Sequence, residues 1–158
     1  MIELNDKLPS VELQYFNKEG EMVTATTEDL FAGKKVVMFA VPGAFTPTCS
    51  QAHLPGYVAL ADKFQAKGVD SIICISVNDA FVMKAWGDAN NAEELIMLAD
   101  GGADFTKAIG LEMETGVFGG VRSQRYAIVV DDGVVTLLNV EQPKEFTVSN
   151  AETVLAAL

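Results

Sequence analysis

The chain has 158 residues, 49% of them hydrophobic and 21% charged, which predicts one globular domain over residues 1–158. The net charge of -11 argues against nucleic acid and anionic membrane surfaces as partners. No apolar run approaches the roughly 20 residues that a membrane span requires.

The N-terminal region predicts a β-hairpin followed by a short helix. Its first residues, MIELNDKLPS, lack the basic flank and apolar core of a signal peptide, so we expect a cytoplasmic location. Residues 11–16 and 22–26 alternate between polar and apolar side chains around a glycine turn, as paired strands do. Thr27 is expected to cap a helix that stops at Gly33.

The stretch VPGAFTPTCSQAHLP, residues 41–55, follows an apolar run that predicts a buried strand at 36–41. Its prolines and glycine disfavour a continued strand. Beyond Cys49, apolar residues recur at three- and four-residue steps to about residue 67, which predicts a helix kinked at Pro55. Cys49 should lie in the first turn, where free N–H groups and the helix dipole favour a thiolate.

The rest of the chain predicts an α/β fold with a mixed central sheet and helices on both faces. The segment 112–121 has three glycines and no periodicity, so we expect a loop there. Ser149 and Glu152 have the spacing of a capping box for a C-terminal helix. Strands are predicted at 69–77, 95–99, 125–130 and 134–140. One helix is expected to start after Asn78 or Asp79, between the first two of these strands. A second, short helix is expected after the strand at 95–99 and ends at Gly110.

Cys49 is the first candidate for chemistry. Two cysteines and one histidine are too few ligands for a structural zinc site, so no metal is expected. A structural disulfide is not expected in a reducing cytosol. A cysteine can also be a plain core residue, but the Thr and Ser neighbours of Cys49 and its proline-kinked loop favour a reactive nucleophile.

Two further side chains are candidates for the same site. Thr46 lies three residues before Cys49, so its hydroxyl could reach the sulfur, although it could equally be a loop or N-cap residue. Arg122 and Arg125 are the only arginines, and both precede a predicted buried strand. A guanidinium near Cys49 would stabilise a thiolate and hold an oxygen-rich substrate, whereas the alternative is a solvated strand end.

The segments PGAFTPTCS, HLPGY, SVNDAFVMKAW and GVRSQRYAIVVDDG together resemble the peroxiredoxins, in particular the type-five (type-II) subfamily. The resemblance covers nearly the whole chain and implies a thioredoxin-like fold, hydroperoxide reduction and no metal or organic cofactor. It implies that Cys49 is the peroxidatic cysteine, that Thr46 contacts thiolate and peroxide, and that Pro42 shields the site. Arg125, rather than Arg122, matches the family arginine. Dimeric relatives imply a homodimer.

The sulfenic acid that forms on Cys49 must be reduced again. Cys74, in a predicted strand, is expected to be a core residue, with a resolving role as the alternative because some plant-type relatives resemble this chain there. No cysteine follows Cys74, and two buried segments would have to unwind to join the sulfurs. We therefore expect a one-cysteine cycle with glutathione or glutaredoxin as reductant, and thioredoxin as the alternative.

Two more residues are assigned to the surroundings of the site. Phe118 is expected to shape its mouth, which hints at organic hydroperoxides beside hydrogen peroxide. His53 is expected at the rim or in a structural role, not as a base. Competing interpretations are a peroxide-sensing redox switch or holdase without sustained turnover, and an α/β binding module without catalysis.

Overall fold

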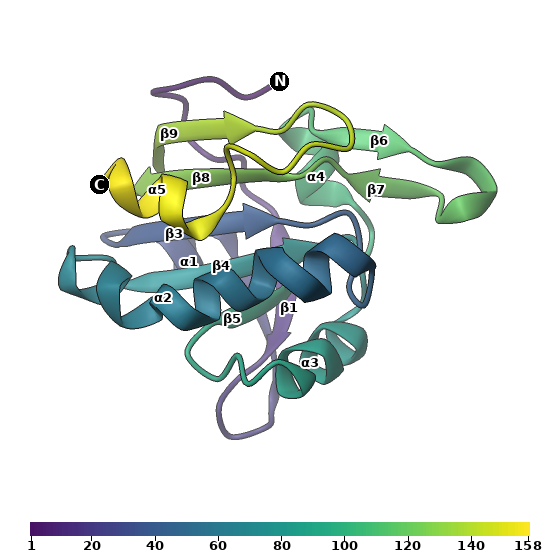
Figure 1. Ribbon diagram of the computed structural model, residues 1–158, viewed down its shortest axis with the longest axis horizontal. Coiled ribbons are helices and arrows are strands. Elements are labelled where there is room, and N and C mark those ends of the chain that lie inside the picture. The colour runs from purple at the N-terminus through teal and green to yellow at the C-terminus, as the bar shows by residue number, and fades with distance from the viewer.

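The apolar strands form a seven-stranded mixed sheet in the computed structural model, which describes all of residues 1–158 (Figure 1). The strand order is β2-β1-β5-β4-β3-β8-β9. The three central strands β3, β4 and β5 are parallel, and the outer strands pair antiparallel. The strands are β1 (Glu12–Phe16), β2 (Met22–Thr26), β3 (Lys35–Ala40), β4 (Ser71–Ser76), β5 (Ile96–Ala99), β8 (Tyr126–Asp131) and β9 (Val134–Val140).

Helices cover both faces of this sheet, as the sequence predicts. One face packs against α2 (Leu54–Ala66), α3 (Ala80–Ala89) and α5 (Ala151–Ala156), which lie in front in Figure 1. The other face packs against α1 (Thr27–Phe31) and α4 (Asp104–Ala108). Neighbouring strand residues alternate between the two cores, because successive side chains of a strand point to opposite faces. This thioredoxin-like arrangement confirms the predicted fold class.

Two helix starts differ from the prediction. Thr26, not Thr27, is the N-cap of α1, and it forms a reciprocal capping box with Asp29. Asn150, not Ser149, caps α5 by accepting the Thr153 amide N–H. The predicted Ser149–Glu152 capping box is therefore wrong, because the Ser149 hydroxyl donates to Glu141 instead.

The segment predicted as a loop at 112–121 contains regular structure. Strands β6 (Glu112–Glu114) and β7 (Val121–Ser123) pair antiparallel around a short 3-10 turn, Gly116–Phe118. This hairpin extends from the body of the molecule at the right of Figure 1. Each strand has only three residues, too few to produce a recognisable alternation, and Gly116 and Gly120 adopt the positive φ angles that the turn needs.

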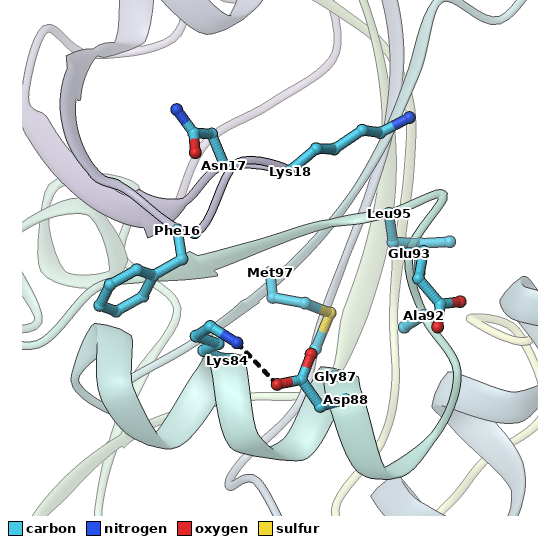
Figure 2. A pocket seen from close by; sticks show the side chains of 11 residues that line it. Phe16, Asn17, Lys18, Lys84, Gly87, Asp88, Ala92, Glu93, Leu95 and Met97 are labelled. Carbon is cyan, nitrogen blue, oxygen red and sulfur yellow. Dashed lines mark hydrogen bonds and ion pairs between the residues drawn. The ribbon is translucent and has the colours of Figure 1, made fainter.

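A shallow cavity of about 300 Å³ lies between the β1–β2 turn and α3 (Figure 2). Phe16, Lys84 and Met97 are among the side chains that line it. Lys84 and Asp88 form an ion pair of 2.7 Å along one turn of α3. The cavity contains neither cysteine nor histidine. None of the helices is long and apolar enough to cross a membrane.

Candidate active site

Cys49 lies at the start of a helix beyond the carboxyl end of β3. The helix begins as a π-helix, Cys49–His53, and continues directly as α2. Pro55 has no N–H, so this first part of the helix lacks one main-chain donor, which accounts for the irregular geometry before the predicted kink. The Ser50 N–H bonds to the Thr46 carbonyl, whereas the Cys49 amide N–H meets no main-chain acceptor. A main-chain donor beside the sulfur is thus free.

Arg125 reaches Cys49 from the other side of the site. It directly precedes β8, the antiparallel neighbour of β3, and the register pairs Ala40 with Tyr126. Its Nη2 donates to Cys49 Sγ at 3.1 Å, although 76 residues separate the two in sequence. Cys49 is fully buried. A half-buried guanidinium therefore lies in hydrogen-bond contact with the buried sulfur.

His53 contacts Arg125 on the buried side of the site. It is fully buried, so of the two predicted positions, rim or structural, it does not occupy the rim. Its Nε2 lies 3.1 Å from the Ser149 carbonyl oxygen, which can only accept, so Nε2 carries the proton. Nδ1 therefore accepts from Arg125 Nη1 at 2.7 Å. Burial and the Arg125 cation lower the pKa of His53 to about 3. A neutral imidazole with its lone pair occupied cannot act as a base for Cys49.

Glu141 and Ser149 complete this network. The sequence shows no sign of Glu141 and indicates Ser149 only as a helix cap. Glu141 follows β9 and is only 6% exposed. It accepts from the N–H groups of Thr147, Val148 and Ser149 and from the Ser149 hydroxyl. Burial raises the pKa of a carboxyl, but these hydrogen bonds outweigh it and lower the pKa of Glu141. Nothing in a single sequence distinguishes such an acid from a solvated one.

The loop before Cys49 is held by its own main chain. The Thr46 hydroxyl donates to the Gly43 carbonyl at 2.7 Å, and no hydrogen bond joins Thr46 to Cys49. Arg122 Nη1 donates to the Pro42 carbonyl at 2.7 Å, and its guanidinium lies over the Phe118 ring. The two arginines therefore have different contacts: Arg125 binds the Cys49 sulfur, while Arg122 holds the loop before Cys49 through the Pro42 carbonyl.

A cavity of about 880 Å³ opens beside these groups. Pro42, Thr46 and Arg125 line it, together with the aromatic rings of Phe118 and Phe146. Phe118 is 74% exposed, so it lies at the mouth, where the sequence placed it. The cavity thus joins an aromatic mouth to the arginine that holds Cys49.

The chain matches the Redoxin family model over residues 3–155. It is 52% identical to Peroxiredoxin-2E-2, chloroplastic, from rice, covering 99% of this chain and 72% of the relative. It is 47% identical to Peroxiredoxin-2B from Arabidopsis thaliana, covering 99% and 98%. The chain belongs to the peroxiredoxin family. Reduced Prx3 from Vibrio vulnificus in complex with H2O2 has a similar structure, with a TM-score of 0.96, 68% identity and 99% of each chain covered.

As a peroxiredoxin, the chain is an enzyme, a thiol-dependent peroxidase. The predicted family and enzyme class are confirmed.

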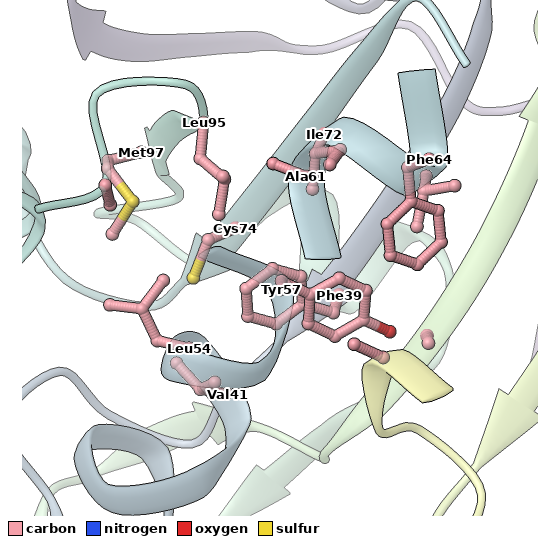
Figure 3. Close-up of a cluster of buried hydrophobic side chains, with 14 of the residues drawn as sticks. Phe39, Val41, Leu54, Tyr57, Ala61, Phe64, Ile72, Cys74, Leu95 and Met97 are labelled. Atoms are coloured by element: carbon pink, nitrogen blue, oxygen red, sulfur yellow. The ribbon is translucent and has the colours of Figure 1, made fainter. Parts of the chain in front are cut away.

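The second cysteine of this peroxiredoxin is a core residue by position. Cys74 is fully buried in β4 among the apolar side chains between the sheet and α2, including Leu54 and Tyr57 (Figure 3). No disulfide is present. Burial raises the pKa of the Cys74 thiol well above its usual value, and the neighbouring Cys49 acts in the same direction.

Proposed function

We propose that Cys49 is the peroxidatic cysteine and that Arg125 activates it. The observation that carries the proposal is the 3.1 Å hydrogen bond from Arg125 to the Cys49 sulfur. The thiolate attacks one oxygen of a hydroperoxide, so that an S–O bond forms and the O–O bond breaks. The leaving oxygen takes a proton and departs as water or an alcohol, and Cys49 becomes a sulfenic acid.

Ionisation alone does not explain a fast enzyme. An ordinary thiol is about 3% thiolate at neutral pH, so complete ionisation gains about 30-fold in rate, or about 2 kcal/mol. Donors that stabilise charge on the leaving oxygen contribute roughly 10²–10³ each. Arg125 and the free Cys49 N–H supply such donors at this site.

Thr46 takes a defined part in this scheme. Its hydroxyl proton is already donated to the Gly43 carbonyl, so its oxygen is oriented as an acceptor. We assign it to accept the O–H of the incoming hydroperoxide, which leaves the peroxide oxygen free for attack. Pro42, whose carbonyl Arg122 holds, lines the cavity beside Thr46 and shields the site from water.

The reducing half of the cycle is assigned to an external thiol. Cys74 is fully buried, and its raised pKa keeps it protonated, so it is a poor nucleophile towards a sulfenic acid. We favour a one-cysteine cycle in which glutathione or glutaredoxin reduces Cys49, with thioredoxin as the alternative reductant. A Cys49–Cys74 disulfide remains the less favoured route.

The aromatic mouth supports both hydrogen peroxide and alkyl hydroperoxides as substrates. Phe118 and Phe146 offer apolar surface to an alkyl group, while the Vibrio vulnificus relative is named as a complex with H2O2. The motifs around Cys49 and Arg125 support assignment of the chain to the type-five (type-II) subfamily. We also assign it a single domain, and a homodimer as its assembly. A cytoplasmic location stays a prediction from the sequence, since the rice relative is named chloroplastic.

The experiment that tests this function is steady-state peroxide reduction with glutathione, glutaredoxin and thioredoxin supplied in turn. Sustained turnover with glutathione or glutaredoxin, lost in Cys49→Ser and retained in Cys74→Ala, supports the proposal. Formation of one sulfenic acid per chain without turnover with any reductant would instead indicate a redox switch or holdase. Turnover that needs both cysteines and thioredoxin would overturn the one-cysteine cycle.

A further inference from the structure

A single carboxylate closes the loop from Glu141 to Ser149. Glu141 accepts three main-chain N–H groups at 2.8–3.0 Å, from residues six to eight positions later, and the Ser149 hydroxyl at 2.7 Å. These donors fold the loop back against the end of β9. No other side chain bonds to the N–H groups of Thr147, Val148 and Ser149, so Glu141 alone supplies their acceptors. The Val148 carbonyl is held separately, by the side-chain amide of Asn139 at 2.9 Å.

The closed loop presents two groups to the pair formed by His53 and Arg125. The Ser149 carbonyl accepts from His53 Nε2 at 3.1 Å and also from the Tyr57 hydroxyl at 2.7 Å. The Phe146 ring lies 4.9 Å from the His53 ring, and the Arg125 guanidinium carbon lies 5.7 Å from the centre of the Phe146 ring. The loop therefore forms one wall around Arg125. Together with Arg125, whose guanidinium can only donate, it also fixes the Nε2–H tautomer of His53.

Glu141 is a neighbour of Arg125 that does not neutralise it. The Glu141 N–H donates to the Arg125 carbonyl at 3.0 Å, so their main chains are adjacent. Yet the only ion pair within 4.0 Å in the molecule is Lys84–Asp88. The Glu141 carboxylate is occupied by the loop, and no carboxylate pairs with the guanidinium that contacts the Cys49 sulfur.

We propose that Glu141 is a positioning residue for Arg125. By closing the loop, its carboxylate places the Ser149 carbonyl, which holds His53 in the Nε2–H tautomer that accepts a hydrogen bond from Arg125. The inference rests on the proposed role of Arg125 towards Cys49. Glu141 touches no reacting atom and acts only through Ser149, His53 and Phe146.

A neutral glutamine of the same shape tests this role. Its amide offers one acceptor oxygen and an NH₂ group, and the NH₂ group would face main-chain N–H donors. Glu141→Gln should therefore loosen the loop without opening a cavity. The matched control is Glu94→Gln, which makes the same change of charge at an exposed side chain that forms no hydrogen bond.

His53 is the only histidine, so its ring nitrogens give unambiguous signals in ¹⁵N NMR. Wild type and Glu94→Gln should show a single Nε2–H tautomer. In Glu141→Gln the two nitrogen shifts should move towards each other as the tautomers mix. Oxidation of Cys49 by hydrogen peroxide should slow by about 10–100-fold, the range expected when a reacting group is misplaced by a fraction of an ångström. Stopped-flow fluorescence of Trp86, whose Nε1 donates to Ser50, can follow that step.

Ser149→Ala provides a second variant in case Glu141→Gln folds poorly. It removes one donor to Glu141 but keeps the Ser149 carbonyl. The ¹⁵N signals of His53 should therefore shift in the same direction as in Glu141→Gln, but by a smaller amount. Unchanged His53 signals in both variants would overturn the proposal, as would an unchanged oxidation rate where the tautomers mix. Arg125→Ala separates the two proposals. Wild-type oxidation in that variant would remove the proposed role of Arg125, while the NMR result for Glu141→Gln would still decide whether Glu141 controls His53.

Discussion

Arg125 donates a hydrogen bond of 2.7 Å to Nδ1 of His53, so a neutral ring orients the guanidinium. A carboxylate in that place would orient it equally well but would cancel much of its charge. Because His53 is neutral, the cation remains available to Cys49, which accepts from the other nitrogen of the same guanidinium at 3.1 Å. His53 therefore orients the Arg125 guanidinium without neutralising its charge.

Replacing Arg125 tests whether it does more than ionise the thiol. We expect Arg125→Ala to slow oxidation of Cys49 by well over the roughly 30-fold that loss of thiolate alone explains, since a donor to the leaving oxygen is lost as well. The measurement is the second-order rate constant for hydrogen peroxide as a function of pH. If alkaline pH restored the variant to the wild-type rate, Arg125 would act on ionisation only.

His53 makes the stability of the fold depend on pH. Its pKa falls from an ordinary 6.5 to about 3 on folding, so the unfolded chain binds a proton that the folded chain does not. Its contribution to stability is complete above the unfolded pKa and is lost as pH falls from there towards 3, by about 1.4 kcal/mol per pH unit. Denaturant unfolding should show this loss between about pH 6.5 and 5, above the ordinary pKa values of carboxyl groups. A variant that cannot titrate, His53→Gln, should lose most of this slope; an unchanged slope would assign it to other groups.

Two buried tyrosines predict opposite effects of the same substitution. The Tyr126 hydroxyl is buried without a hydrogen-bond partner, whereas the Tyr57 hydroxyl donates to the Ser149 carbonyl at 2.7 Å. Tyr126→Phe should leave the free energy of unfolding unchanged or raise it by up to about 1 kcal/mol, and Tyr57→Phe should lower it by about 1–2 kcal/mol. Urea unfolding of both variants provides the comparison. A loss in Tyr126→Phe as large as that in Tyr57→Phe would show that the Tyr126 hydroxyl has a partner.

Gly43 is required by the side chain of Arg122. A Cβ at Gly43 would overlap Arg122 Nη1, which donates to the Pro42 carbonyl. Gly43→Ala should therefore displace Arg122, destabilise the fold by about 1–3 kcal/mol and slow peroxide reduction. The matched control is Gly56→Ala on α2, where the added Cβ meets only Ala151 Cβ at 3.6 Å and alanine favours the helix. Equal stability of the two variants would argue against a tight fit around Arg122.

Cys74 decides between the two reducing cycles. Because it is fully buried in β4, we expect Cys74→Ala to keep its turnover with glutathione or glutaredoxin and to lose about 1 kcal/mol or more of stability from lost packing. Mass spectrometry of wild-type protein treated with one equivalent of peroxide should show a Cys49 sulfenic acid or its glutathione adduct. An intramolecular Cys49–Cys74 disulfide as the main product would contradict the one-cysteine cycle.

The strands and long helices are predictable because their signals are local. The β1–β2 and β8–β9 hairpins and the runs around β3 and β4 stand out by their apolar pattern. The N-cap of α3 is Asp79, one of the two residues predicted. The β6–β7 hairpin has strands too short to show alternation, and Ser149 was assigned to a cap although it bonds to Glu141. Such partners are chosen by tertiary contact, which a pattern along one sequence does not record.

The candidate site divides in the same way. Cys49, Thr46 and Arg125 lie in recognisable motifs. The structure places Thr46 and Arg125 in the lining of one cavity and Cys49 in contact with Arg125. The sequence leaves His53 open between a rim and a structural position, because helical spacing gives a face but not a depth. Glu141 carries no local signal, since its function depends on main-chain donors that only the folded loop supplies.

Both arginines of a chain with net charge -11 line the same cavity. With Lys144 and the carboxylates of Glu141 and Glu145, which also line it, the cavity has a small excess of positive charge in a molecule of negative net charge. The two half-reactions should therefore differ in their sensitivity to ionic strength. A hydroperoxide is uncharged, so added salt should leave the rate of Cys49 oxidation nearly constant. An anionic thiol is repelled by the surface yet attracted at the cavity, so salt should change the rate at which it reduces Cys49.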